Sequence, residues 1–306
     1  MIVIPPIIIT SERLVSSSVY PVDAGETAWT SGGTYALGDV RTRAALGRRY
    51  EAKIAHSGSA VPPEDDAVNW REIGATNRMA MFDMGRMERT IGAPGQSLDV
   101  RIRPGRRINA LYLGGLVAAY VDVYMFVDDV LVWSRTNVSM SRRRTRSWRQ
   151  YYYGEFRQQQ SLLWLDLPPY ANAEIRVVIR NGSDSPQCAA LVVGQSEFIG
   201  DAAWGADNDE LNFSTIERDK FSWATLIPRR AVPNNKQTLR LPKQDVDRVR
   251  ELRRSLNAVP AVYSTMDQRT DDPWFESFLV FGIYTRFRIK AQDAKFASID
   301  LETEEL

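Results

Sequence analysis

The chain contains very few residues of the types that most often build metal centres and nucleophilic catalytic sites. Its 306 residues include one cysteine, Cys188, and one histidine, His56. A single cysteine excludes an intrachain disulfide framework and a multi-cysteine zinc site, and a single histidine excludes a multi-histidine metal site. No G-x-S-x-G element of the kind that presents a nucleophilic serine is present either. We expect Cys188 to be a buried free thiol and His56 to lie where a strand meets a loop.

Excess charge and long hydrophobic runs are missing as well. The chain has 39 basic and 38 acidic residues, which gives no overall electrostatic reason to expect nucleic acid or a membrane surface as a partner. No apolar run approaches the roughly 20 residues of a membrane span, so membrane insertion is not expected. The apolar run 1–9 contains Pro5 and Pro6 and has no basic leader, so it is a poor signal peptide. We interpret it as an extended arm or first strand, docked on this chain or on a neighbour.

The hydrophobic residues that are present suffice for two or three folded domains. They make up 44% of the chain and include eight tryptophans. Apolar and polar residues alternate with a period of two at 98–103, 121–127 and 175–180, and residues 189–193 form a continuous apolar run suited to a central strand. Because this alternation is typical of strands with one buried face, we predict an antiparallel, jelly-roll-like β-sandwich for residues 77–204.

Residues 205–306 predict a small α+β domain. A helix is expected from Pro242 to Leu256, because four apolar side chains in this segment fall on one helical face: Val246, Val249, Leu252 and Leu256. Apolar runs at 237–241, 259–263, 278–284, 286–290 and 297–301 supply the strands. The acidic run 207–210 offers oxygen ligands for calcium, but it lacks the spacing of an EF-hand loop. We therefore interpret residues 205–210 as a solvated linker.

Residues 20–76 form a compact first module of short β runs separated by glycine, proline and aspartate. The spacing of Trp29, the Tyr35–Val40 turn, Tyr50 and Trp70 resembles the small chitin-binding-type carbohydrate modules. The resemblance implies that Trp29, Tyr50 and Trp70 stack on sugar rings, whose C–H faces are apolar. The alternative is that these three rings form the core of a module too small to have another one, and we prefer this core interpretation, especially for Trp70.

Two further segments resemble tail and baseplate proteins of double-stranded DNA bacteriophages. Residues 76–83 match the Thr-Asn-Arg-x-x-Met-Phe-Asp element that joins such a module to a larger β domain in this family. We expect Met79, Met81 and Phe82 to anchor one domain edge there, and Arg78 to pair with Asp83. In the C-terminal third, the order of motifs follows the family's order: Phe213-Ser214, Asp219-Lys220-Phe221, Pro228-Arg229-Arg230, Pro260 to Tyr263, Val280-Phe281-Gly282 and Leu301-Glu302. Ser222 stands where the family's turn has glycine.

The most unusual local composition lies inside the predicted sandwich. Arginine and aromatic residues are concentrated at Arg142, Arg143, Arg144, Arg146, Trp148, Arg149, Tyr151, Tyr152 and Tyr153. Such a segment can anchor a protein interface, as a loop or long hairpin docked on an acidic neighbour. It can also be a plain solvated basic loop, or it can bind an anionic glycan or a nucleic-acid strand through charge and stacking. We prefer the interface.

The combined resemblance implies four regions and a structural function. The regions are an arm at 1–19, a carbohydrate-binding-like module at 20–76, the sandwich at 77–204 and a tail-assembly domain at 205–306. We expect a component of the phage tail, in the baseplate or tail tip, assembled in the host cytoplasm and retained in the virion. Its expected partners are other tail proteins, further copies of the chain in a symmetric assembly, and a host surface glycan; nucleic acid is not expected. The alternative is a receptor- or carbohydrate-binding protein without an assembly role.

An enzymatic function is not expected, and no cofactor is implied. A glycan hydrolase would need two carboxylates set about 5 to 10 Å apart. The available candidates are Asp122, Asp128, Asp129 and Asp166. Predicted turns and strand faces account for all four.

Overall fold

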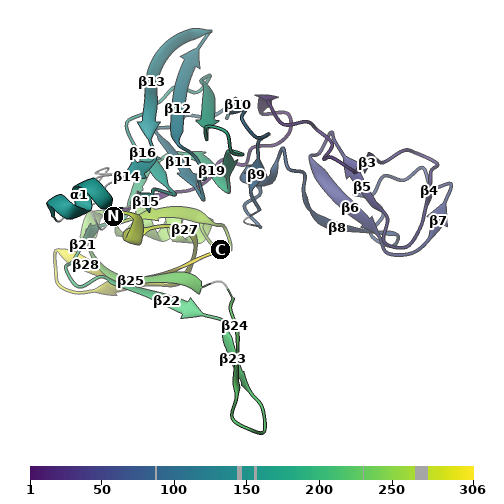
Figure 1. The fold of residues 1–306 in the computed structure, drawn as a ribbon. Helices are drawn as coiled ribbons and strands as arrows, with labels where there is room; N and C mark the ends of the chain where they lie inside the picture. The colour runs from purple at the N-terminus through teal and green to yellow at the C-terminus, as the bar shows by residue number, and fades with distance from the viewer. Residues whose placement is uncertain (87, 143–146, 155–156, 230, 266–274) are drawn as a thin grey trace. The chain divides into compact units, whose positions relative to one another are not determined.

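The computed structural model of the chain describes residues 1–306 except 87, 143–146, 155–156, 230 and 266–274 (Figure 1). The chain divides into two compact units, one of residues 7–193 and the other of residues 1–6 together with 194–306. Both are built mainly from antiparallel strands, so the prediction of a mainly β fold is confirmed. The four-region division at 1–19, 20–76, 77–204 and 205–306 stays a prediction.

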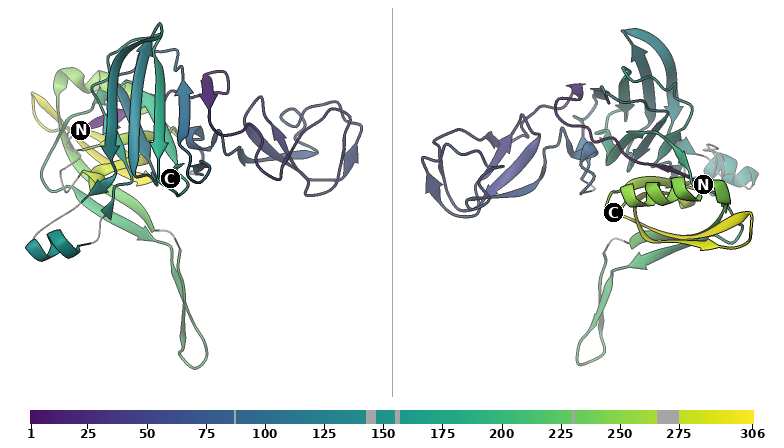
Figure 2. Two further views of the ribbon diagram at one scale, coloured as in Figure 1. Left: turned by 45° about the horizontal axis from the view of Figure 1, so that its top comes forward. Right: turned by 180° about the vertical axis from the view of Figure 1, so that it is seen from behind.

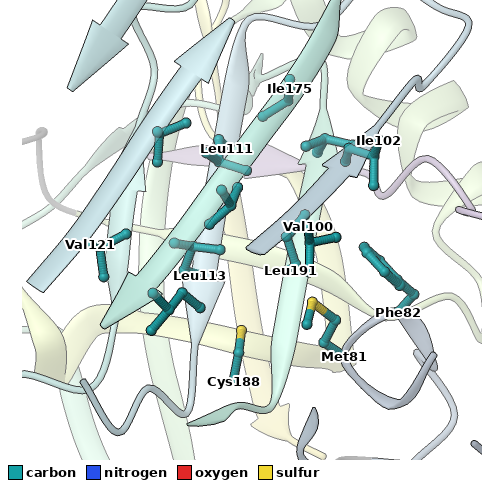
Figure 3. Close-up of a cluster of buried hydrophobic side chains, with 14 of the residues drawn as sticks. Met81, Phe82, Val100, Ile102, Leu111, Leu113, Val121, Ile175, Cys188 and Leu191 are labelled. Carbon is teal, nitrogen blue, oxygen red and sulfur yellow. The ribbon is translucent and has the colours of Figure 1, made fainter. Parts of the chain in front are cut away.

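The unit of residues 7–193 contains two sheets that share one hydrophobic core. The first sheet has the order β13 (Val130–Ser139), β12 (Tyr120–Val127), β17 (Glu174–Arg180), β10 (Leu98–Ile102) and β2 (Leu14–Ser17). The second has the order β16 (Leu162–Trp164), β11 (Ala110–Gly114) and β19 (Ala190–Gly194). On β10, Leu98, Val100 and Ile102 are buried between the sheets, as the alternation predicts (Figure 3).

The predicted anchor at residues 79–83 is confirmed in part. Met81 and Phe82 lie on a short 3₁₀ helix, Ala80–Phe82, and with Met79 they are buried in the core of the sandwich (Figure 3). The predicted pairing of Arg78 with Asp83 is wrong. The Asp83 carboxylate accepts a 2.9 Å hydrogen bond from Arg48 instead. Arg48 can reach it because it is paired with Ala75, at the end of the strand that leads into the anchor.

The same unit contains the small module. Its four-stranded sheet has the order β3 (Thr27–Ala28), β5 (Val40–Arg43), β6 (Arg48–Ala52) and β8 (Trp70–Ala75). A two-stranded ladder of β4 (Thr34–Tyr35) and β7 (His56–Ser57) accompanies it. His56 therefore begins a very short strand that follows a bend, close to the expected junction of strand and loop.

In its described residues, the other unit consists mainly of a large sheet and one α-helix (Figure 2). The sheet order is β20 (Glu197–Phe198), β1 (Ile2–Ile4), β26 (Ala261–Ser264), β27 (Leu279–Ala291), β28 (Phe296–Glu305), β25 (Ala231–Pro242) and β21 (Asp201–Ala202). Helix α2 (Val246–Ser255) follows a 3₁₀ turn at Lys243–Asp245, within the predicted segment. Val249 and Leu256 are fully buried against side chains of the sheet, which confirms the predicted apolar face. The N-terminal run supplies β1, so it is a first strand on its own chain.

Two predictions about this unit are wrong. Residues 205–210 are not a linker, because Asp207–Asn212 forms β22 and pairs along its length with β25. The side chain of Asn208 donates a 2.8 Å hydrogen bond to that of Asn235 on the partner strand, so polar residues are accommodated at this sheet edge. The two strands expected at 278–284 and 286–290 are one strand, β27, which begins at Leu279 after a 3₁₀ turn at Glu276–Phe278. The register in which β27 pairs with β28 shifts between Tyr284 and Arg286. This irregularity interrupts the sequence pattern of one strand, so the pattern suggested two.

Cys188 is buried, as expected, on the short strand β18 (Gln187–Cys188), which pairs with β9 (Thr90–Ile91) (Figure 3). Burial raises the pKa of its thiol from an ordinary 9.0 to about 12. We expect iodoacetamide to leave the native thiol unmodified at pH 8 and to alkylate it fully in urea, as measured by intact mass.

The pH dependence of the same thiol has a defined sign. Burial raises the pKa of the thiol in the folded state. The free energy of unfolding is therefore highest below about pH 9, where the thiol is protonated in both states, and it decreases as the pH rises toward 12. A Cys188→Ala variant should therefore show a smaller decrease in unfolding free energy over that range than the natural chain. Alkylation of the native chain at pH 8 would contradict the burial.

Candidate functional site

Two of the three aromatic residues proposed to bind sugar form the core of the small module. Trp70 is 3% exposed and Tyr50 5%, and both pack with Tyr35 and Ala52. The Trp70 ring meets the Tyr35 ring edge-on at a centroid distance of 4.9 Å. Since no ring face of Tyr50 or Trp70 is open to a ligand, the core interpretation accounts for both.

Trp29 is the one candidate of the three that reaches solvent. It lies directly after β3, is half-buried, and packs against the edge of the module core. The guanidinium of Arg43 lies 4.9 Å from the centre of the Trp29 ring and donates two hydrogen bonds, of 3.0 and 2.6 Å, to Glu64. Because the Arg43 guanidinium lies over this ring, only the part of the indole that it leaves exposed can offer an apolar face to a sugar, with Arg43 and Glu64 as the polar rim.

The arginine- and tyrosine-rich segment, expected to be a loop or long hairpin, contains a short helix between two paired strands. Helix α1 (Trp148–Tyr153) lies between β14 (Ser141–Arg142) and β15 (Arg157–Gln158), which pair with one another. Trp148, Tyr152 and Tyr153 are largely exposed, as is Arg149, and the Trp148 and Tyr152 rings stack at a centroid distance of 6.4 Å. Arg143, Arg144 and Arg146 lie outside the described residues, and so do the side chains of Arg142 and Tyr151.

A second exposed element is the hairpin of β23 (Thr215–Arg218) and β24 (Ala224–Ile227). Within the described part of the chain, this ladder pairs with no third strand, and it extends away from the sheet of its own unit (Figure 1). Ile216 lies directly opposite Leu226, and Arg218 opposite Ala224, so these four share one face. Ile216 and Leu226 are both more than half exposed. The hairpin therefore has a mainly apolar face, interrupted by Arg218, that nothing in the described chain covers.

The turn of this hairpin presents two aromatic residues. The carboxylate of Asp219 accepts hydrogen bonds from the backbone N–H groups of Phe221 and Trp223, at 2.9 and 3.0 Å. Ser222 between them has a φ of 65°, in the left-handed region that favours glycine. Phe221 and Trp223 are 70% and 76% exposed. The turn is thus held by its own aspartate while its rings point to solvent.

Replacing Ser222 with glycine is expected to stabilise the hairpin. A non-glycine residue in the left-handed region costs about 1 kcal/mol, and removal of this cost exceeds the added flexibility of the unfolded chain. Hydrogen exchange of the β23 and β24 amides should slow by a factor that corresponds to about 0.5 kcal/mol. Ala224→Gly, at an ordinary strand position, should accelerate the same exchange. Faster exchange in Ser222→Gly would show that the turn does not need the left-handed conformation.

The same unit contains an apolar pocket of about 570 Å³. Its lining is mainly apolar: Met1, Ile2, Phe198, Ala202, Ala203, Trp204, Gly205, Ala206 and Phe278. Asp201 and Thr265 are the polar lining residues. Trp204 is 99% exposed at its rim. Residues 201–212, which include this rim and strand β22, contain Asp201, Asp207, Asp209 and Glu210 and no basic residue. Of these acidic residues only Asp201 lines the pocket, and β25 places Arg240 opposite Asp201 and Lys236 opposite Asp207, so the pocket is mainly apolar without an acidic border.

The carboxylates considered for hydrolysis serve local structure. Asp128 and Asp129 have positive φ in the turn between β12 and β13. Asp122 accepts hydrogen bonds from Arg180 and from the backbone of Asn137, and Asp166 pairs with Arg135. Among the residues that the structure describes, no group of three or more His, Cys, Asp or Glu side chains is placed to hold a metal ion. In the same part of the chain, no helix has the length and hydrophobicity needed to cross a membrane.

The sequence predicted neither the exposed hairpin nor the pocket as functional surfaces. The sequences around Ile216 and Leu226 are typical of half-buried strands. They give no indication that the described chain leaves these two side chains uncovered. No protein-family model matches the chain, and no curated protein matches its sequence.

Proposed function

We propose that the chain is a structural component of a bacteriophage tail, in the baseplate or tail tip, that assembles with other tail proteins and with further copies of itself. The observation that carries this proposal is the uncovered apolar face of the β23–β24 hairpin. An isolated two-stranded hairpin is only marginally stable in water, and exposed apolar clusters of this kind mark interaction surfaces. The hairpin fits an element that becomes ordered and buried when neighbours bind.

A second exposed surface supports an assembly role. Helix α1 presents Trp148, Tyr152 and Tyr153 to solvent beside Arg149. Aromatic residues and arginine are the side chains most enriched at protein interfaces. This surface fits an acidic neighbouring protein, as the composition of residues 142–153 suggests. The resemblance of residues 76–83 and of the C-terminal motifs to tail proteins supports the phage assignment.

The proposed role is non-enzymatic and located in the virion. A chain with one buried cysteine suits synthesis in the reducing host cytoplasm and assembly there. The test is immunogold labelling of intact virions, with an antibody raised against the isolated chain. Label at the distal tail is the expected result. Intact virions without label, under conditions in which the antibody binds the native chain, would exclude the structural role.

A second candidate function is carbohydrate binding through the small module, and the half-exposed Trp29 ring favours it. In this case Trp29→Ala should abolish binding on a glycan array, while the melting temperature changes by only a few degrees because the ring lies at the edge of the core. Tyr20→Ala, which removes an aromatic ring that is 83% exposed, is the matched control and should bind as the natural chain does. Unfolding of the module in Trp29→Ala would instead assign this ring to the core.

A further inference from the structure

A polar pocket of about 350 Å³ lies at one end of the five-stranded sheet, in the unit of residues 7–193. We propose that it binds one ring of a neutral saccharide. All six lining residues are among those that the structure describes: Arg103, Phe126, Asp128, Asp129, Asn172 and Glu174. The site is separate from the one considered at Trp29 in the small module, and the inference goes beyond the proposed tail function without resting on it.

The strand order brings the lining residues together from three parts of the chain. β12 lies between β13 and β17, and β17 lies between β12 and β10. Phe126 near the end of β12 is paired with Glu174 at the start of β17, and the next residue of β17, Ile175, is paired with Ile102 at the end of β10. The β12–β13 turn, the residues before β17 and those after β10 therefore meet at the same end of the sheet.

The charges in the pocket are largely compensated. The buried Glu174 carboxylate pairs with Arg101 at 2.5 Å and also with Arg103. Arg101 further pairs with Asp129 at 3.1 Å. A cationic ligand would meet the guanidinium of Arg103, and an anionic ligand would meet the carboxylates of Asp128 and Asp129. Because a charge of either sign meets like charge in this pocket, the lining favours a neutral polar ligand.

The lining both donates and accepts hydrogen bonds. Asn172 donates one from its side-chain amide to the Asp128 carboxylate, at 3.2 Å. This contact uses only part of the capacity of either group, since an ionised carboxylate has about four lone-pair sites and an amide has an acceptor oxygen and two N–H donors. Arg103 likewise has N–H groups beyond the one that Glu174 engages. A hydroxyl is both donor and acceptor, so neighbouring sugar hydroxyls can bond to carboxylate, amide and guanidinium groups together.

The Phe126 ring supplies the apolar part of the lining. The guanidinium of Arg101 lies 5.3 Å from the ring centre, and the Tyr124 ring lies at a centroid distance of 6.3 Å. Neither of these neighbours lines the pocket, so the part of the Phe126 ring that does is left open by both. A sugar has an apolar C–H face and a rim of hydroxyls, which match an aromatic ring beside carboxylate and amide groups. The pocket volume lies near the lower limit of the roughly 300 to 1,000 Å³ of ligand sites, which suits a single ring.

The test screens the full chain on an array of neutral oligosaccharides and measures each hit by isothermal titration calorimetry. Asp128→Gly removes one carboxylate, and glycine suits the left-handed φ of 49° at this position, so the turn is kept. Asn172→Ala removes the neighbouring amide. Each change should weaken binding about fivefold or more, because each removes hydrogen bonds to the ligand. Phe126→Leu should weaken it about threefold or more, because the aromatic contact is lost.

Two further variants are controls, and thermal melting followed by circular dichroism confirms that every variant is folded. Asn137→Gly also changes a left-handed residue, with a φ of 53°, but near the other end of β13. Trp29→Ala removes the ring considered for sugar binding in the small module. Both variants should bind the glycan as the natural chain does.

A natural chain that binds no neutral glycan would overturn the inference, and so would binding that the three pocket variants leave unchanged. Loss of all binding in Trp29→Ala alone would also overturn it and assign recognition to the small module. Stronger binding to a lysine tetramer or to sulfated glycans than to any neutral glycan would reject a neutral ligand. Immunogold labelling of virions is independent of each of these results, so the proposed function stands or fails separately.

Discussion

Replacing Trp70 with alanine is expected to unfold the small module while the strands of the sandwich stay protected. The buried core of this module consists of Tyr35, Tyr50, Ala52 and Trp70, so one substitution removes its largest member. Truncation of a buried tryptophan costs about 3 to 5 kcal/mol, which is comparable to the whole stability of a domain of this size. The Trp70 ring also supplies the edge-on contacts with Tyr35 and His56, at 4.9 and 5.1 Å, and both would be lost.

Hydrogen exchange measured on the intact chain separates the two outcomes for Trp70→Ala. The amides of β5, β6 and β8 should lose protection, whereas those of β10 and β17 should keep it. Val68→Ala is a suitable control because this nearby side chain is largely exposed, and it should leave both sets unchanged. Retained protection of β6 and β8 in Trp70→Ala would mean that contacts outside the aromatic cluster hold the module together.

The sandwich could be predicted from sequence because its strands have one buried and one open face. Leu98, Val100 and Ile102 are buried and alternate with Asp99 and Arg101, and this period of two follows directly from strand geometry. Helix α2 could be predicted for the equivalent reason, since its three apolar residues and Leu256 at its end fall on one face. Such patterns indicate that one face of a segment is buried. In β10 and α2 that face is indeed buried, in the sandwich core and against the sheet.

The same reasoning fails where the cover is missing or the pattern is polar. The first four residues of β22, 207–210, suggest a linker because all are acidic or amide, yet backbone pairing with β25 needs no apolar side chain. Ile216 and Leu226 have the pattern of a half-buried strand, but the described chain leaves them exposed. Alternation gives the side of a strand on which apolar residues lie. It carries no information about which chain provides the opposite surface.

The candidate site was predictable only where local chemistry decides the outcome. The sequence placed Trp70 in a core because so small a module has few other large side chains to bury. At Ser222 it was the resemblance to phage tail proteins that pointed to a glycine position of a turn, and the structure has a φ of 65° there. The pocket beside Trp204 could not be foreseen, because its walls come from the N-terminal strand, from residues near 200 and from Phe278. Only the sheet order brings these segments together.

Gly282→Ala is expected to have the second large effect, this time on the sheet of the unit formed by residues 1–6 and 194–306. Gly282 lies buried in β27, between Ala261 of β26 and Glu305 of β28. A Cβ atom added there would lie 1.9 Å from the backbone oxygen of Glu304. Backbone cannot move aside as the end of a flexible side chain can, so the methyl group must separate two paired strands.

The expected loss is about 3 kcal/mol, from the displaced strand together with the weakened ladder hydrogen bonds. Amide exchange in β26, β27 and β28 should accelerate in the intact chain, while β10 and β17 of the other unit keep their rates. Gly85→Ala is the matched control, since its Cβ would meet only the Asp83 carboxylate at an ordinary 3.6 Å. If Gly282→Ala exchanges as slowly as the natural chain, β27 and β28 must approach less closely at this position than the structure shows. The register in which β27 pairs with β28 would then need revision.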